Sequence, residues 1–377
     1  MRIAIYGGAF NPVHNEHVNI AIAAVKRLEL DKLIIMPTFR SPHKSGQLIA
    51  RAKDRLEMCR LAFADIPCAE VSDYEIKRGG VSYSYLTCRH FKKLFKDDEL
   101  YFIIGADMLE SFSLWREPEE ILKCATLAVC AREDERALKT AILKFRSDFR
   151  SEIVTIDYIG KAVSSTRIRV LAALGEDTAG LVPEKVRLFL RDGKIYVIPG
   201  IGKVKKYLTE ERWRHTVGVA VLAAENCGRV RVFEEDAVIA AALHDCAKYL
   251  GSGAEELKGF IPPQNVPDPV MHQYGGAYVA EHVFGVRDEG ILNAVRYHTS
   301  GRENMSGLEK LIFLADLLEE GRDFDGVEKL RKIFRRDIDE CFMAALKNQL
   351  EHLKATGGEV YPLTERAYLY MKENYEQ

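Results

Sequence analysis

Two histidines that follow a pair of glycines are the first residues in this sequence that could do chemistry. Gly7 and Gly8 end a short apolar run, and His14 and His17 stand three residues apart before a helical pattern. Glycines at a strand-to-helix turn let backbone N–H groups approach a phosphate, and the helix N-terminus adds positive potential. Both imidazoles could face one polyphosphate and stabilise the charge that develops during phosphoryl attack. A glycine-rich turn with two surface histidines also fits, because paired glycines alone are a weak signal.

A hydroxyl-rich helix start offers a second phosphate contact. Ser164 and Thr166 can cap the helix and expose its N–H groups, and Arg169 supplies a guanidinium that can bind phosphate through two donors. Taken alone, this segment is better explained as an ordinary N-cap.

Histidine and aspartate recur along the C-terminal half. His244 and Asp245 follow the apolar run 237–243, where burying both side chains is costly unless something pairs with them. A metal ion removes this cost, because imidazole and carboxylate are good ligands for iron, manganese or zinc. Each of these histidines alone fits a hydrogen-bonded core residue better, whereas the whole set favours a metal site between the helices of a bundle. The other members each lie on or beside a different predicted helix: His215, His272, His298 and Asp316.

The elements that must position these two groups differ between the halves. Strand patterns (3–6, 33–36, 100–104, 126–130, 153–156) alternate with helical patterns (18–28, 53–64, 85–94, 118–124), which predicts a parallel sheet wrapped by helices. Ligands of such sheets bind beyond the carboxyl ends of the strands. Later patterns are helical: 211–226, 236–249, 275–283, 288–298, 307–319, 327–334, 337–356 and 364–376. We therefore expect an α/β domain over 1–197, a linker over 198–206 and an all-α bundle over 207–377.

Composition excludes several classes of protein. The chain has 377 residues and a net charge of −2, so it has no general attraction for nucleic acid or anionic membranes. No apolar run approaches the ~20 residues that span a bilayer. Its eight cysteines lack a disulfide-framework spacing, which indicates a reducing compartment. We expect a soluble cytoplasmic protein with neither nucleic-acid nor membrane partners.

The glycine–histidine segment opens a longer series of motifs. In chain order the series is 7–17, 36–44, 78–84, 102–107, Trp115, Arg132, 164–169 and 181–183. This series resembles bacterial nicotinate-nucleotide adenylyltransferases of the nucleotidylyltransferase superfamily, over residues 1–197. The resemblance implies a Rossmann-like fold and Mg²⁺-dependent attack of nicotinate mononucleotide on the ATP α-phosphate, which releases pyrophosphate and forms deamido-NAD.

The resemblance also implies roles for residues. His14, His17 and Arg169 would hold the ATP phosphates and act in catalysis. Lys44 would approach the mononucleotide phosphate, and Trp115 would stack on the pyridine ring. The residues implied to bind ATP or the mononucleotide are Gly7, Gly8, Phe10, Lys44, Asp107, Trp115, Arg132, Ser164 and Thr166. Glu16 stands where the family usually has glycine.

The histidine set belongs to a second series of motifs, at 215–220, 243–248, 296–302, 315–322 and 361–364. The series resembles HD-domain phosphohydrolases, and within them the YqeK group of symmetrical dinucleoside tetraphosphate hydrolases, over about residues 203–377. The resemblance implies two divalent metal ions, with iron expected, and cleavage of diadenosine tetraphosphate to two ADP. The implied metal ligands are His215, His244, Asp245, His272, His298 and Asp316, with Asp245 also catalytic. The implied substrate contacts are His215, Lys248, His272, His298, Thr299, Asp316, Arg322, Tyr361, Pro362 and Thr364.

Together the two halves indicate a bifunctional enzyme that acts on ATP, nicotinate mononucleotide and dinucleoside polyphosphates. One alternative is that only the HD half is catalytic and the N-terminal half is a nucleotide-binding or oligomerisation module. Another keeps both active sites with different substrates. The sequence does not determine whether the chain forms a homo-oligomer.

Overall fold

The computed structural model describes residues 1–40, 46–132, 135–160 and 163–375, and it divides into two compact units. Unit 1 comprises Met1–Ser45, Ile49–Arg169 and Asp177–Tyr196. Unit 2 comprises Gly46–Leu48, Val170–Glu176 and Val197–Gln377. The second unit thus takes two short segments from within the first 197 residues, and the domain limits drawn from the sequence stay a prediction.

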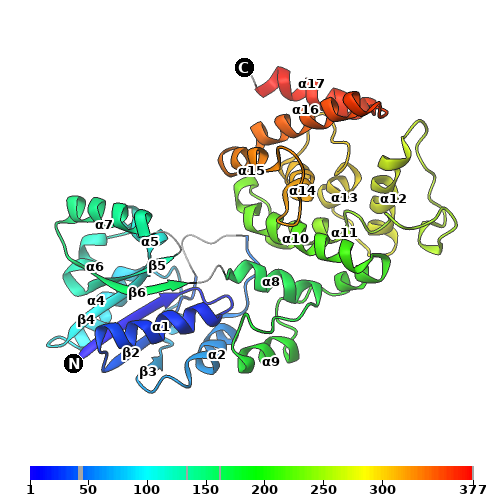
Figure 1. Cartoon of the computed structure of the whole chain (residues 1–377). Helices are drawn as coiled ribbons and strands as arrows, with labels where there is room; N and C mark the ends of the chain where they lie inside the picture. Colours follow the sequence, from blue (N-terminus) through cyan, green and yellow to red (C-terminus); the bar gives the residue numbers. More distant parts are fainter. Residues whose placement is uncertain (41–45, 133–134, 161–162, 376–377) are drawn as a thin grey trace. The chain divides into compact units, whose positions relative to one another are not determined.

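Unit 1 is built on a parallel sheet with the strand order β3-β2-β1-β4-β5-β6 (Figure 1). The strands are β1 (Arg2–Gly8), β2 (Lys32–Pro37), β3 (Ala69–Val71), β4 (Glu99–Gly105), β5 (Thr126–Arg132) and β6 (Ile153–Gly160). Ile3, Ile5, Leu33 and Ile35 have no exposed surface, as expected for strands covered by helices on both faces. The strand order reverses between β1 and β4, which opens a crevice beyond their carboxyl ends. The expected α/β class is confirmed.

Helices connect these strands. They are α1 (Asn15–Leu28), α2 (Ala52–Phe63), α3 (Tyr74–Arg78), α4 (Ser84–Leu94), α5 (Ala106–Glu110), α6 (Pro118–Cys124), α7 (Glu135–Phe149), α8 (Ser165–Leu174) and α9 (Glu184–Asp192). The sequence patterns located α1, α2, α4 and α6 to within three residues and missed α3, α5, α7 and α9. The first two of these have five residues each, too few for a helical period to be recognised.

Unit 2 is a bundle of helices, which confirms the expected all-α class (Figure 1). The helices are α10 (Glu210–Asn226), α11 (Glu234–Leu243), α12 (Asp268–His282), α13 (Glu289–Arg296), α14 (Gly307–Leu318), α15 (Val327–Arg336), α16 (Ile338–Thr356) and α17 (Pro362–Tyr375). Val238, Leu311, Leu314 and Phe342 form part of its core, with no exposed surface. Most residues of α11 and of α14 are buried, because neighbouring helices cover them.

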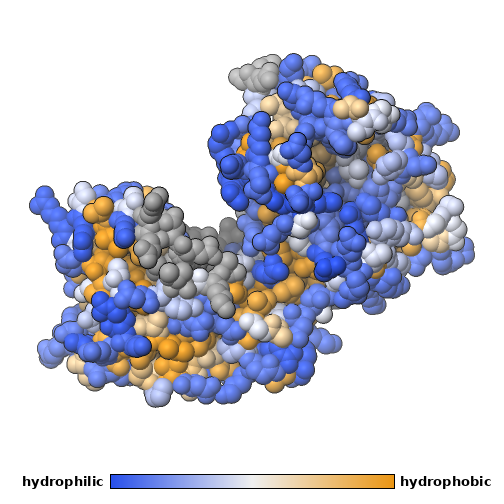
Figure 2. All heavy atoms as spheres, viewed as in Figure 1, coloured by the Kyte–Doolittle hydropathy of each residue, from blue (hydrophilic) through white to orange (hydrophobic). Residues whose placement is uncertain are grey.

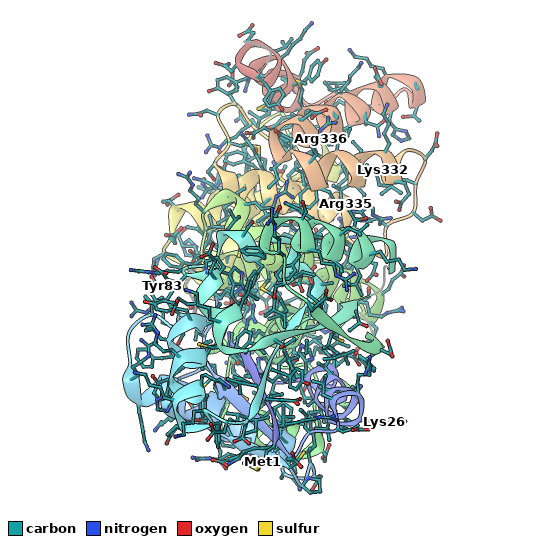
Figure 3. All side chains as sticks on the ribbon, turned by 90° about the vertical axis from the view of Figure 1, so that its left-hand side faces the viewer. Met1, Lys26, Tyr83, Lys332, Arg335 and Arg336 are labelled. Atoms are coloured by element: carbon teal, nitrogen blue, oxygen red, sulfur yellow. The ribbon has the colours of Figure 1, made fainter. Side chains whose placement is uncertain are left out.

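Helix α15 shows how the outer layer of the bundle is patterned. Val327, Leu330 and Phe334 are buried at helical spacing, whereas Lys332 and Arg335 project outward (Figure 3). The same region is hydrophilic in the space-filling view of Figure 2. An apolar stripe under a charged face is the expected pattern for a surface helix.

Two stretches of unit 2 show local structure that the sequence patterns did not predict. Residues 198–206 contain most of the 3-10 helix η2 (Ile201–Tyr207), whose Ile201 and Val204 are buried in the core of unit 2; the linker expected there stays a prediction. The helix expected over 236–249 ends at Leu243, and the N–H groups of Cys246 and Lys248 then bond only three residues back.

Among the helices that the structure describes, none combines the length and the apolar character that crossing a membrane requires.

Candidate functional sites

The glycine–histidine loop lies between β1 and α1, at the crevice where the strand order reverses. His14 is the N-cap of α1; its backbone N–H donates to His17 Nδ1 over 3.1 Å, and the two ring centroids are 3.7 Å apart. Phe10 packs edge-on against the His17 ring at 5.0 Å. A Cβ on Gly8 would lie 3.2 Å from the Phe10 ring, so this position favours glycine. The structure therefore brings both histidines to the start of one helix, as the sequence predicts.

Buried polar side chains support this loop from below. The Asn11 side-chain oxygen accepts hydrogen bonds from the Ala50 N–H and the Tyr196 hydroxyl. Arg169 is 2% exposed, and its guanidinium donates to the Asn11 carbonyl over 2.7 Å and to Thr166 Oγ1 over 2.9 Å. The structure thus places Arg169 beneath the loop, and its predicted contact with ATP phosphates stays a prediction.

Arg55, on α2, is a second buried support that the sequence analysis missed. Its guanidinium donates to the carbonyls of Ala9, Phe39 and Ala50. Burial lowers its pKa. Because the three carbonyls come from separate segments, Arg55 ties the glycine-rich loop to the chain that follows β2.

Glu16 is buried, and donors from the protein satisfy its carboxylate. Its Oε2 accepts from the Tyr158 hydroxyl over 2.8 Å, and its Oε1 accepts from Asn19 Nδ2 over 3.1 Å. Burial and the bond to Glu16 raise the pKa of Tyr158, which keeps the phenol a donor. Gly160 also packs against Glu16, since a Cβ there would lie 3.0 Å from Oε2. The residue that departs from the family pattern therefore has its own hydrogen-bonding pocket on β6.

The other residues predicted to bind nucleotide have varied positions. Asp107 is exposed at the start of α5, just beyond the carboxyl end of β4. Trp115 is half-buried and packs against Phe102 and Phe112 at centroid distances of 6.3 Å and 5.3 Å. Ser164 caps α8 by accepting from the N–H of residue 167 over 3.1 Å. Lys44 and the side chain of Arg132 lie outside the described residues.

In unit 2, five helices and their ends bring the predicted metal ligands together. His215 comes from α10, His244 and Asp245 follow α11, and His272 lies on α12. His298 follows α13, and Asp316 lies on α14. Two groups of ligand atoms each fit within 4.8 Å: His215, His244 and Asp245, and then Asp245, His272 and His298. Asp245 belongs to both groups.

Hydrogen bonds at Nδ1 fix the orientation of three of these imidazoles. Nδ1 of His244 lies 2.6 Å from the Ala241 carbonyl, and Nδ1 of His298 lies 2.7 Å from the Val295 carbonyl. A carbonyl only accepts, so Nδ1 carries the proton and Nε2 keeps its lone pair. Nε2 of His244 is buried and makes no hydrogen bond among the described residues. These imidazoles could therefore act as metal ligands.

Glu319, which the sequence analysis missed, fixes the orientation of the third imidazole, that of His215. Its Oε1 lies 3.0 Å from His215 Nδ1, and its Oε2 accepts from the Gly321 N–H. A carboxylate on the far nitrogen of a ligand histidine is the usual support in metal sites. Gly218 is needed for this contact, because a Cβ there would lie 2.4 Å from Glu319 Oε2.

Asp245 has no exposed surface and lies among the ring nitrogens of three histidines. Its Oδ2 lies 3.2 Å from His244 Nε2, and its Oδ1 lies 3.2 Å and 3.6 Å from Nε2 of His272 and His298. Burial favours the protonated form, but these histidines outweigh it and hold the pKa of Asp245 well below its ordinary value. Because its two oxygens face different histidine groups, Asp245 can bridge two metal ions.

Cations surround the two aspartates. Lys248 Nζ lies 3.4 Å from Asp245 Oδ1, and Arg322 Nη2 lies 2.5 Å from Asp316 Oδ1. Both were predicted to contact substrate, and both are about one-third exposed. Arg212 also contacts Asp245 Oδ2 and was missed, although it stands one helical turn before His215 on α10.

The remaining predicted substrate contacts are Thr299, Tyr361, Pro362 and Thr364. Thr299 Oγ1 lies 3.0 Å from His298 Nε2 and 3.3 Å from His272 Nε2, so it belongs to the cluster. Gln273, also missed, is fully buried and accepts from the backbone N–H groups of Thr299 and Ser300, which holds this turn in place. Tyr361 bonds to the Tyr274 hydroxyl over 2.9 Å. Beside it Pro362 is exposed and Thr364 is buried.

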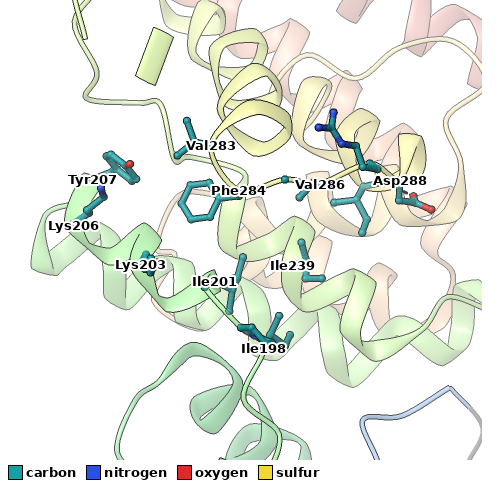
Figure 4. Close-up of a pocket in the computed structure, with 15 residues that line it drawn as sticks. Ile198, Ile201, Lys203, Lys206, Tyr207, Ile239, Val283, Phe284, Val286 and Asp288 are labelled. Atoms are coloured by element: carbon teal, nitrogen blue, oxygen red, sulfur yellow. Dashed lines mark hydrogen bonds between the residues drawn. The ribbon is translucent and has the colours of Figure 1, made fainter. Parts of the chain in front are cut away.

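A pocket of about 620 Å³ also lies in unit 2, and none of the predicted metal ligands lines it (Figure 4). Ile201, Ile239 and Phe284 form part of its apolar wall, with Lys203 and Lys206 at its edge. Tyr207 lies beside Lys206, whose Nζ is 4.5 Å from the centroid of the Tyr207 ring. This pocket is separate from the residues that carry the chemistry.

Comparison with known families matches both halves of the chain. A sequence model of the cytidylyltransferase-like family matches residues 5–171, and a model of the HD domain matches residues 212–321. The chain therefore joins a nucleotidyltransferase domain of this class to an HD domain.

Individual relatives identify the family more closely. A Thermotoga maritima protein named "probable nicotinate-nucleotide adenylyltransferase" is 40% identical over 186 residues, which are 49% of this chain and 89% of that protein. Over its N-terminal half, the chain belongs to the nicotinate-nucleotide adenylyltransferase family.

A relative that matches almost the whole chain extends the likeness to the second half. A Mycoplasma genitalium protein named "probable nicotinate-nucleotide adenylyltransferase/Ap4A hydrolase" is 29% identical over 92% of this chain and 97% of its own length. The crystal structure of a Clostridium acetobutylicum protein, titled "predicted HD superfamily hydrolase involved in NAD metabolism", is 32% identical over 46% of this chain and 95% of that one, with a TM-score of 0.42.

Proposed function

We propose that the chain is a bifunctional enzyme. Unit 1 transfers the adenylyl group of ATP to nicotinate mononucleotide, and unit 2 hydrolyses dinucleoside polyphosphates with divalent metal ions. Its preferred substrate in unit 2 is diadenosine tetraphosphate, which it cuts into two ADP. All eight cysteines remain as thiols, in keeping with a reducing cytoplasm.

Adenylyl transfer is supported by the position of His14 and His17 at the crevice where the strand order reverses. The reaction is in-line attack of the mononucleotide phosphate oxygen on the ATP α-phosphorus, with pyrophosphate as the leaving group. It needs no protein nucleophile, so positioning and charge stabilisation carry the catalysis. His14 and His17 donate hydrogen bonds to the phosphates, and Mg²⁺ would neutralise part of their charge. Glu16, which stands where the family usually has glycine, accepts hydrogen bonds from Tyr158 and Asn19. These bonds stabilise its negative charge within the protein.

Hydrolysis is supported above all by Asp245, which two histidine groups share. The first group, with Asp316 beside it, would hold one metal ion, and His272 and His298 would hold a second. Such ions polarise phosphoryl oxygens and activate water. Lys248 and Arg322 lie at the partly exposed side of the cluster, where they can bind the phosphates of the substrate. Iron suits this mixture of imidazole and carboxylate ligands.

Chromatography of the reaction products tests both activities. Incubation with ATP, Mg²⁺ and nicotinate mononucleotide should yield deamido-NAD and pyrophosphate; failure would leave unit 1 as a nucleotide-binding module. Incubation with diadenosine tetraphosphate and Fe²⁺ or Mn²⁺ should yield ADP alone. Formation of ATP with AMP would show asymmetrical cleavage and contradict the proposal for unit 2.

A further inference from the structure

Arg212 is a cation in direct contact with a carboxylate that we propose to bind a metal ion. Its Nε and Nη2 both contact Asp245 Oδ2, and its Nη2 lies 3.9 Å from Asp316 Oδ1. Asp245 has no exposed surface, and the Arg212 side chain is only 14% exposed. The guanidinium therefore neutralises a buried carboxylate that would otherwise be costly to keep charged.

The oxygen that Arg212 contacts is also the one that the first histidine group needs. Oδ2 of Asp245 lies 3.2 Å from His244 Nε2, and Asp245 forms the first group of possible metal ligands with His215 and His244. A divalent ion bound there and a guanidinium on the same oxygen would repel each other strongly, because little water separates them. Both cations cannot keep their full contact with Oδ2.

Arg212 and Arg322 differ in how firmly the protein holds their guanidinium groups. Arg322 also donates through Nε to the Asp316 carbonyl over 2.7 Å, so its own loop holds it. Among the described residues, the guanidinium of Arg212 contacts only the carboxylates of Asp245 and Asp316. Once a metal ion takes these oxygens, nothing described in the structure retains the Arg212 side chain.

We infer that Arg212 is a built-in competitor of the metal ion: its guanidinium is the counter-ion of Asp245, and a metal ion must displace it to bind. This inference rests on the metal site proposed for unit 2. It makes Arg212 a residue that stabilises the protein before metal loading and lowers its affinity for metal. The site would then load only where the divalent ion is abundant enough to displace the arginine.

Titration of Mn²⁺ into the chelator-treated full chain tests the inference. Arg212→Gln should bind Mn²⁺ about five-fold or more tightly than the wild type, the lower end of a typical coupling between two sites. The same variant, before Mn²⁺ is added, should melt at a lower temperature than the wild type, because Asp245 loses its counter-ion. Arg214→Gln is the matched control, since Arg214 is exposed on the same helix and should change neither quantity.

Each outcome bears on the inference separately from the proposed function. Asp245→Asn gives the background of Mn²⁺ binding outside the site, and wild-type binding no stronger than this background would refute the metal site itself. If the wild type binds but Arg212→Gln binds equally or more weakly, only the role of Arg212 is overturned. If Arg212→Gln does not fold, Arg212→Lys decides, because lysine keeps the charge but loses the two-donor contact: tighter Mn²⁺ binding supports the inference and unchanged binding refutes it.

Discussion

The two candidate sites of this chain are built by opposite means. The loop of unit 1 offers backbone N–H groups and two histidines within eleven consecutive residues, and its charged supports, Arg55 and Arg169, are buried beneath it. The site of unit 2 gathers side chains from a stretch of about a hundred residues, from His215 to Asp316. Its charged side chains lie within the site itself. A phosphate loop thus depends on a stretch of backbone held in shape, whereas a metal site depends on the packing of several helices.

This difference predicts how each site fails. Loss of one side chain from the loop should weaken stabilisation of the transition state but leave the structure of the site intact. Loss of a shared carboxylate from the helical cluster should remove the metal ions on which all the chemistry depends. The substitutions below separate these two behaviours.

Asp245→Asn should have the largest effect. We expect hydrolysis of diadenosine tetraphosphate to fall to background and bound metal to be lost, because the neutral amide replaces the one carboxylate that both histidine groups share. Adenylyl transfer should be unchanged. Metal analysis of the purified protein and chromatography of the products measure both effects, with Asp325→Asn, an exposed acidic residue, as the control. An unaltered metal content would refute the bridging role.

His17→Ala should lower adenylyl transfer by about 10²-fold, the usual cost of removing one donor that stabilises a transition state. Hydrolysis should remain intact, since His17 lies in unit 1. Steady-state rates of pyrophosphate release measure the loss, and His352→Ala, at an exposed position, serves as the control. Near-normal transfer would contradict a role for His17 in catalysis.

Glu319→Ala should weaken Mn²⁺ binding by about ten-fold, because partners of ligand histidines contribute to metal affinity at this level. The cause is the lost contact to His215 Nδ1. Glu319→Gln keeps an acceptor oxygen and should lose less affinity. Calorimetric titration of both variants measures the effect, and equal affinities in the wild type and both variants would show that Glu319 does not support the site.

The Glu16–Tyr158 pair should give the smallest effect. Tyr158→Phe removes one hydrogen bond to a buried carboxylate, so we expect unit 1 to lose about 1 kcal/mol of unfolding free energy. Combination with Glu16→Gln should cost less than the sum of the two single changes, as for residues in direct contact. Denaturant unfolding of the single and double variants measures the coupling. Strict additivity would mean that Tyr158 does not hold Glu16.

The sequence alone determined much of this protein. Alternating apolar runs fixed the α/β class of the first half, because a buried parallel strand and an amphipathic helix leave different periods. The contiguous motif from Gly7 to His17 located the glycine–histidine loop, since a loop between one strand and the next helix is local in sequence. The six metal-ligand candidates could also be recognised by residue type, because buried histidine and aspartate need a partner.

Only the tertiary structure decided how these side chains are paired. The division of the histidines into two groups that share Asp245 depends on helix packing, which no local period records. The same holds for Arg212 on Asp245, for Glu319 behind His215 and for Tyr158 on Glu16. Each is an ordinary polar residue in its own segment and acquires its role from a carboxylate or an imidazole distant in the sequence. Packing decided these contacts because a buried charge is stable only where the fold brings a partner to it.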